Sequence, residues 1–95
     1  MDIQFTWDEN KHQLNFARHR VSFEEAIEAF FDPFVVEDFD RTHSDEEPRY
    51  NLTGLSSRRL LFIVFTEPEP GIIRLISARK AEKKHQAIYA QNKFR

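Results

Sequence analysis

The chain has 95 residues, 40% of them hydrophobic and 32% charged, which is enough for one domain with a single core. It contains no cysteine, so disulfide bonds, thiolate metal sites and a thiol nucleophile are excluded. No apolar run approaches the roughly 20 residues that a membrane span requires, and no signal-peptide pattern opens the chain. We therefore expect one domain over residues 1–95, in the cytoplasm and without membrane contact.

The net charge of −2 conceals a division between the two halves of the chain. Residues 1–48 carry 4 Lys/Arg and 13 Asp/Glu, whereas residues 49–95 carry 10 Lys/Arg and 3 Asp/Glu. The basic half could meet nucleic acid or an acidic partner, and the acidic half a basic one. Alternatively, the two halves neutralise each other across the fold.

The first predicted elements are a strand and a helix. Residues 2–7 alternate apolar and polar side chains, which predicts a short strand with one buried face. Asp8 is suited to cap a helix over residues 9–18. The apolar stripe of this helix is narrow and consists of Leu14 and Ala17, with Phe16 to one side.

The second predicted helix has the clearest signals. Ser22 and Glu25 occupy the N-cap and N3 positions of a capping box. Apolar side chains follow at helical spacing, which predicts a broad buried face, and the helix ends at residues 32–33. The residues of this face are Phe23, Ala26, Ile27, Phe30 and Phe31.

The segment after this helix changes from a predicted strand over residues 34–39 to an acidic stretch. This stretch contains six carboxylates and one histidine, His43. The carboxylates are Glu37, Asp38, Asp40, Asp45, Glu46 and Glu47. Hard cations bind carboxylate oxygens, but this spacing matches no known metal-binding loop. A solvated loop is therefore preferred over a metal site, and we expect no cofactor.

The second half predicts a meander of strands. Residues 49–53 and 60–66 form a hairpin around residues 54–59, and the uniformly apolar second strand is central. Pro68 and Pro70 should stop strand pairing before the next strand begins at Ile72.

The strand that begins at Ile72 is apolar on both faces apart from Arg74, which is typical of a central strand. Its character changes at residues 77–79, which predicts a helix from residue 80 to about residue 93. The junction would bring Arg74, Ser77, Arg79 and Lys80 to one region. Fixed cations on a rigid element suit phosphate recognition. Alternatively, these arginines pair with carboxylates and only hold the helix in place.

The element order predicts an α+β fold: an N-terminal strand, two helices, a meander of strands and a C-terminal helix. Strands joined by short turns should pair antiparallel. With helices on one face of the sheet, the partly covered other face is where Arg49, Arg74 and Arg79 could converge.

Three groups of residues occur in order over nearly the whole chain. The first group consists of residues 5–11 (FTWDENK), Asn15, residues 18–19, residues 21–26 (VSFEEA) and residues 31–32. The second consists of residues 47–49 and Gly54. The third consists of residues 60–66, residues 74–81 (RLISARKA) and Tyr89. Together they resemble the BrnT family of type II toxins, whose partners are BrnA antitoxins.

The resemblance implies a mostly antiparallel, RelE-like ribonuclease fold and a bacterial toxin that cleaves RNA and inhibits translation and growth. It also implies neutralisation by a BrnA-like antitoxin, through which the complex would contact operator DNA only indirectly. The complex could contain a homodimer of the toxin.

The resemblance further implies a metal-independent reaction in which the 2′-hydroxyl of the RNA is the nucleophile. Such chemistry needs cations at the scissile phosphate and groups that exchange protons. The implied catalytic residues are Arg79, Arg49, Arg74, His19, His85 and Lys11, and the implied substrate-binding residues are Lys80, Ser77 and Tyr89. Tyr89 could stack on a base or hold an arginine.

Two residues depart from the family pattern. Arg20 stands where the family usually has glycine, so a turn that needs positive φ would be strained or reshaped. His85 stands where the family usually has glutamate, and its imidazole could substitute as a base. Otherwise the chain is a catalytically impaired antitoxin-binding partner and co-repressor of its own operon.

Overall fold

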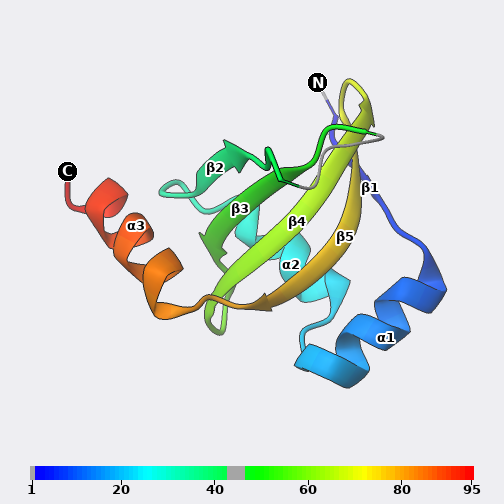
Figure 1. Cartoon of the computed structure of the whole chain (residues 1–95), viewed down its shortest axis with the longest axis horizontal. Coiled ribbons are helices and arrows are strands. Elements are labelled where there is room, and N and C mark those ends of the chain that lie inside the picture. The colour runs from blue at the N-terminus through cyan, green and yellow to red at the C-terminus, as the bar shows by residue number, and fades with distance from the viewer. Residues whose placement is uncertain (1, 43–46) are drawn as a thin grey trace.

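The computed structural model describes residues 2–42 and 47–95, which form three helices and one five-stranded sheet (Figure 1). The predicted element order is confirmed. The elements are β1 (Gln4–Thr6), α1 (Glu9–His19), α2 (Phe23–Ala29), β2 (Val36–Phe39), β3 (Tyr50–Leu55), β4 (Leu60–Glu69), β5 (Ile72–Lys80) and α3 (Lys83–Lys93).

The strands lie in the order β1-β5-β4-β3-β2, and the predicted α+β class is confirmed. Strands β2 to β5 form an antiparallel meander, and β1 pairs parallel with the start of β5. Figure 1 shows α2 behind the sheet, α1 beside β5, and α3 at the end where β5 finishes. The face opposite α2 is therefore largely left open by the helices.

The core lies between α2 and the sheet. Its buried members are Val21, Phe23, Ala26, Ala29, Leu52, Leu61, Ile63, Phe65, Ile73, Leu75 and Ala78. The predicted apolar face of α2 is confirmed except at Phe31, which is 67% exposed. Gly54 permits the close packing of α2 on β3, because a Cβ there would lie 2.6 Å from the carbonyl oxygen of Ala29.

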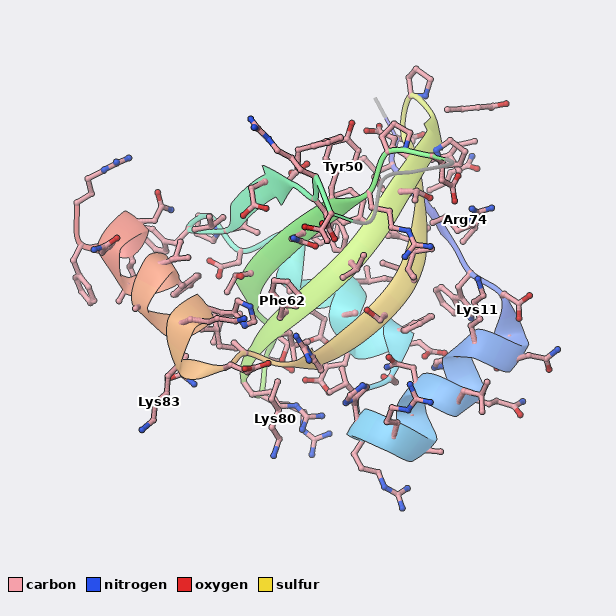
Figure 2. The ribbon with its side chains drawn as sticks, viewed as in Figure 1. Lys11, Tyr50, Phe62, Arg74, Lys80 and Lys83 are labelled. Carbon is pink, nitrogen blue, oxygen red and sulfur yellow. The ribbon has the colours of Figure 1, made fainter. Side chains whose placement is uncertain are left out.

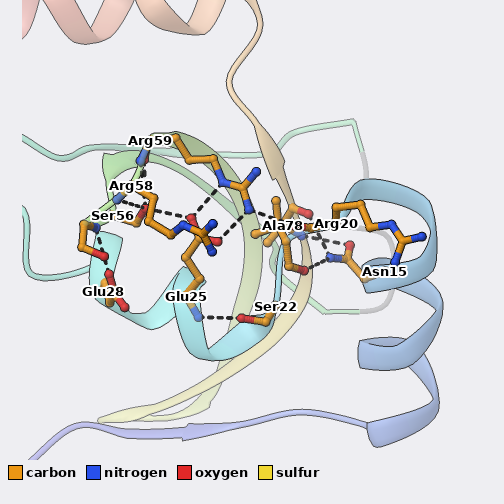
Figure 3. A network of polar contacts seen from close by, with 11 residues as sticks. Asn15, Arg20, Ser22, Glu25, Glu28, Ser56, Arg58, Arg59 and Ala78 are labelled. Atoms are coloured by element: carbon orange, nitrogen blue, oxygen red, sulfur yellow. Dashed lines mark hydrogen bonds and ion pairs between the residues drawn. The ribbon is translucent and has the colours of Figure 1, made fainter.

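The predicted apolar face of α1 is wrong. Leu14 and Phe16 are 64% and 42% exposed, whereas the buried residue of α1 is Asn15. The Asn15 amide donates to the carbonyl oxygens of Val21 (3.0 Å) and Ala78 (2.9 Å), and its oxygen accepts from the Ala78 N–H (3.1 Å) (Figure 3). Asn15 thus forms hydrogen bonds with both the N–H and the carbonyl of Ala78. A neighbouring strand would otherwise satisfy these groups at this part of β5.

The turn after α1 has the strained backbone that was expected at Arg20. Arg20 is the C-cap residue with φ 57° and ψ 30°, and it is the one non-glycine residue with positive φ in the described part of the chain. Its N–H donates to the carbonyl of Phe16 at 2.8 Å. This left-handed conformation is the one that helix ends usually give to glycine.

A partly buried ion pair joins α2 to the turn between β3 and β4 (Figure 3). Ser22 accepts from the Glu25 N–H as predicted, but the Glu25 carboxylate binds the Arg59 guanidinium at 2.7 and 2.9 Å. Ser56 donates to the same carboxylate at 2.8 Å. Arg59 also donates to the carbonyl of Arg20 at 2.8 Å, so the network ties the end of α1 to the same turn.

Several predicted boundaries differ from the structure, among them the end of α2, which is at Ala29 and not at residues 32–33. Strand β5 continues through residues 77–79 to Lys80, so these residues belong to the strand and α3 begins only at Lys83. Strand β4 continues past Pro68 to Glu69, with an irregular register between Thr66 and Glu69 that accommodates the proline. Strand β2 starts at Val36, because residues 32–35 form a turn in which the Asp32 carboxylate accepts from the Phe34 N–H.

We predict that Arg20→Gly raises the free energy of unfolding by about 0.5–1 kcal/mol, because glycine adopts the left-handed conformation without a Cβ clash. Urea unfolding measures the change. The control is Gln13→Gly, an exposed change inside α1, which should lower the free energy of unfolding by about 1 kcal/mol. If Arg20→Gly lowered the free energy of unfolding as much as Gln13→Gly does, the left-handed backbone at Arg20 would not be strained.

We predict that Glu25→Gln lowers the free energy of unfolding by about 2 kcal/mol at pH 7, because it removes the charge that pairs with Arg59. The Arg59 hydrogen bonds hold the pKa of Glu25 below its ordinary value. The stabilisation is therefore complete above the ordinary pKa and is lost as the pH falls through the lower folded pKa. Urea unfolding from pH 7 to pH 3 should show a shallower pH dependence for Glu25→Gln than for the wild type. The exposed change Glu69→Gln should leave both the stability and its pH dependence nearly unchanged.

Candidate active site

A pocket of about 420 Å³ lies on the open face of the sheet, where β2 to β5 meet the start of α3. It combines basic, acidic and aromatic side chains. Its lining residues are Asp38, Asp40, Asn51, Phe62, Val64, Arg79, Lys84 and His85. The pocket therefore holds fixed cations beside groups that can accept or donate protons.

Arg79 is held in this pocket by three separate contacts. It lies opposite Phe62 in the β4–β5 register, and its guanidinium carbon is 5.4 Å from the centroid of the Phe62 ring. Its Nη2 atom lies 3.2 Å from the carboxylate of Glu82. A guanidinium restrained by a strand, a ring and a carboxylate loses little entropy when it binds a phosphate.

His85 forms the wall of the pocket from the first turn of α3. Its ring stacks on Phe62, with centroids 3.9 Å apart and an interplanar angle of 12°. Its Nδ1 atom accepts a hydrogen bond of 3.1 Å from the Glu82 N–H. Burial, together with the cations of Lys84 and Arg79, holds the pKa of His85 below its ordinary value, so the ring is neutral at pH 7.

A second cavity, of about 200 Å³, lies between α1 and β5. Its lining brings together Lys11, His19 and Ser77 from the predicted site, with Leu14, Asn15, Arg18 and Ile76. We call it the α1 groove. It adjoins the pocket, because Ser77 pairs with the pocket residue Val64 across β4 and β5. Among its described lining residues there are basic side chains and no carboxylate, which suits an anion.

The three predicted arginines do not converge. Arg74 pairs across the sheet with Thr66 and Arg79 with Phe62, so they lie about 16 Å apart at roughly 3.3 Å per strand residue. Figure 2 shows Arg74 and Phe62 toward opposite ends of the sheet. Arg74 forms an ion pair with Glu47, and the carbonyl of Arg49 accepts from the Asp40 N–H. Of the three, only Arg79 lines the pocket.

Two further predicted residues lie away from both cavities. Lys80, at the end of β5, is exposed and lines neither the pocket nor the α1 groove. Tyr89 is 7% exposed, and its hydroxyl donates to the Asp32 carboxylate at 2.5 Å. Burial and this hydrogen bond raise the pKa of Tyr89 to about 12. The role of Tyr89 at the substrate stays a prediction; in the structure its buried hydroxyl ties α3 to the end of α2.

Several residues of the pocket were not predicted as site residues from the sequence. They are Asp38, Asp40, Asn51, Phe62 and Lys84. Asp38 lies within the predicted strand over residues 34–39, but it was grouped with Asp40 in an acidic stretch, and its pairing with Asn51 was not predicted. The alternation of β2 and β3 could have indicated that Asp38 and Asn51 share a face. Nothing local in the sequence distinguishes Phe62 from the buried side chains beside it.

The metal prediction concerned an acidic stretch of which His43, Asp45 and Glu46 lie outside the described residues. Within residues 2–42 and 47–95 no group of three or more His, Asp or Glu side chains could hold a metal ion. In the same residues no helix is long and apolar enough to cross a membrane.

Comparison with solved structures concerns the fold. The fold is similar to that of the 1.1 Å crystal structure of the Brucella abortus ribonuclease toxin BrnT, with a TM-score of 0.59 and 23% identity. The similarity covers 85% of this chain and 99% of the other. At this identity it concerns the fold alone.

A sequence-family model then identifies the family. The model described as "Ribonuclease toxin, BrnT, of type II toxin-antitoxin system" matches residues 7–85. The chain therefore belongs to the BrnT family of ribonuclease toxins, and the resemblance noted in the sequence is confirmed. No curated protein matches the chain significantly.

We predict that Tyr89 and Asp32 are energetically coupled, because the hydroxyl donates to a carboxylate in a partly buried setting. Tyr89→Phe should lower the free energy of unfolding by about 2 kcal/mol. In a double-mutant cycle with Asp32→Asn, measured by urea unfolding, the coupling should exceed about 1 kcal/mol. Additive effects would show that the hydroxyl contributes nothing through Asp32.

Proposed function

We propose that this chain is a RelE-like, metal-independent endoribonuclease toxin that acts in the cytoplasm, where it cleaves RNA and thereby inhibits translation and growth. The observation that carries the proposal is the position of Arg79, held over Phe62 in a pocket that also contains carboxylate, ammonium and imidazole groups. Membership of a ribonuclease toxin family supports the same reaction class.

The pocket suits an attack by the 2′-hydroxyl of the RNA on the adjacent phosphorus. The bond from phosphorus to O2′ forms and the bond to O5′ breaks, which gives a 2′,3′-cyclic phosphate and a free 5′-hydroxyl. In our proposal the Asp38 carboxylate accepts the proton of the 2′-hydroxyl, and the Lys84 ammonium supplies a proton to the departing O5′. Arg79 stabilises the charge that develops on the phosphate oxygens, because its planar guanidinium can donate two hydrogen bonds at once.

The α1 groove extends this site. Because Lys11, Arg18 and His19 lie beside β5, next to the pocket, an RNA strand crossing the open face could place a neighbouring phosphate there. In this proposal Lys11 and His19 bind the RNA backbone, while the proton-exchanging groups lie in the pocket. Such contacts carry no sequence information and make binding dependent on salt.

The family defines the class of partner, since type II toxins are neutralised by an antitoxin protein. We propose that the partner of this chain is a BrnA-like antitoxin and that contact with operator DNA is made through that antitoxin. Arg79 and Lys84 of the pocket, with Lys11 and Arg18 of the α1 groove, offer cations that an acidic segment of a partner could cover, and doing so would block access of RNA to Arg79.

We predict that Arg79→Ala reduces RNA cleavage by at least 100-fold, because it removes the cation at the scissile phosphate. Arg74→Ala should change cleavage less than threefold, since Arg74 pairs with Glu47 away from the pocket. The measurements are cleavage of a labelled RNA oligonucleotide in EDTA and growth of bacteria after induction. Equal losses in the two variants would contradict a site centred on Arg79. A folded wild type that cleaves no RNA would leave the alternative, an antitoxin-binding co-repressor.

A further inference from the structure

We infer that His85 is a fixed hydrogen-bond donor, which presents its Nε2–H to the RNA phosphate beside Arg79 and does not act as a general base. The inference rests on the proposed function, because it assigns a role within the same pocket. It replaces the expectation that the imidazole could serve as a base.

The backbone at the start of α3 determines which ring nitrogen carries the proton. The N–H of Glu82 can only donate, and it points to Nδ1 of His85 at 3.1 Å. Nδ1 must therefore offer its lone pair. A neutral imidazole has one N–H, so the proton lies on Nε2.

The alternative ring states would each lose contacts. A proton on Nδ1 would place two donors against each other at a helix N-terminus, where His85 is buried. Rotating the ring by half a turn would exchange Nδ1 for a carbon and leave the Glu82 N–H without its acceptor. The stack on Phe62, at 3.9 Å and 12°, holds the ring plane in place.

The remaining nitrogen is available to a ligand. His85 lines the pocket, and the hydrogen bond that the structure gives its ring is made by Nδ1, on the side of the Glu82 N–H. The charged groups around the ring are Lys84, Arg79, Glu82 and Asp38. A base at Nε2 would need the proton moved to Nδ1, which the Glu82 N–H opposes.

The role that remains is a hydrogen bond from Nε2–H to a non-bridging phosphate oxygen, with no proton transferred. His85 and Arg79 would then bind one phosphate from two directions, since both contact the Phe62 ring. Proton exchange stays with Asp38 and Lys84. A neutral donor of this kind stabilises developing negative charge without releasing its own proton.

Two substitutions separate a donor from a base. In His85→Gln, the amide oxygen can accept from the Glu82 N–H while the amide nitrogen donates into the pocket. In His85→Glu, the carboxylate can accept from the same N–H but can only accept in the pocket. Glutamine and glutamate both suit the N3 position of a capping box, so both variants should fold. Ala87→Glu, at an exposed position of α3, controls for the added negative charge.

The probe for binding is a fluorescein-labelled 2′-O-methyl RNA oligonucleotide, which cannot cleave itself. We expect His85→Gln to bind it within tenfold of the wild type, His85→Glu to bind at least 30-fold more weakly, and Ala87→Glu to bind within threefold. Cleavage of the matching 2′-hydroxyl oligonucleotide should follow the same order. Stronger cleavage by His85→Glu than by His85→Gln would overturn the inference in favour of a base.

The tautomer itself is measured on the wild type by ¹⁵N NMR of histidine side chains, with His85→Gln to identify the signal. A protonated Nε2 and an unprotonated Nδ1 at pH 7 support the inference, and the opposite tautomer overturns it. The proposed function can fail separately from this inference. If the wild type and its variants bind the 2′-O-methyl probe with the expected order of affinities but the wild type cleaves no RNA, His85 is a hydrogen-bond donor and the chain is not a nuclease.

Discussion

The side-chain amide of Asn15 is the contact on which the arrangement of the first third of the chain depends. Beyond the short parallel strand β1, the outer edge of β5 has no neighbouring strand in the described chain, and Asn15 bonds both peptide groups of Ala78 there. Removing the amide would leave buried peptide groups without partners, at about 1–3 kcal/mol for each. Asn15 joins α1 directly to β5, and the α1 groove exists because the helix lies there.

The division of charge along the chain is used in two ways. Part of it is neutralised across the fold, because Glu25 in the acidic half binds Arg59 in the basic half, and Glu47 binds Arg74. The rest gathers on the open face, where Arg79 and Lys84 line the pocket and Lys11 and Arg18 line the α1 groove. The two interpretations of the charge pattern therefore describe different regions of one molecule. The Glu25–Arg59 and Glu47–Arg74 pairs stabilise the fold away from the pocket, whereas Arg79, paired with Glu82, and Lys84 lie where a ligand could reach them.

The sequence predicts elements well where apolar periodicity and packing agree. The face of α2 and the central strand β4 follow from their patterns because burial there is hydrophobic. The prediction for α1 was wrong because a buried amide, rather than Leu14, holds that helix. Strand β5 was predicted too short, since Ser77 and Arg79 suit a helix locally while pairing with β4 extends the strand.

The site was less predictable than the fold, because it depends on which residues meet across strands. Motif positions indicated Arg79, His85 and Lys11, but the register places Arg74 at the other end of β5. Asp38 and Phe62 belong to the pocket only because β2 and β4 lie on either side of β3. Such a set of neighbours is a property of the sheet order, which no local pattern reports.

Helix α3 supplies residues of the pocket but is attached to the rest of the fold by few contacts. In the described chain the core cluster takes no member from α3, which is held by the Tyr89 hydroxyl, by a bond from Asn92 to Phe34 and by the stacked ring of His85. Detachment of this helix would remove Lys84 and His85 from the pocket and leave the sheet and α2 intact. The fraction of active molecules would then depend on the docking of α3 as well as on global unfolding, because a molecule with its sheet and α2 folded could still lack a complete pocket.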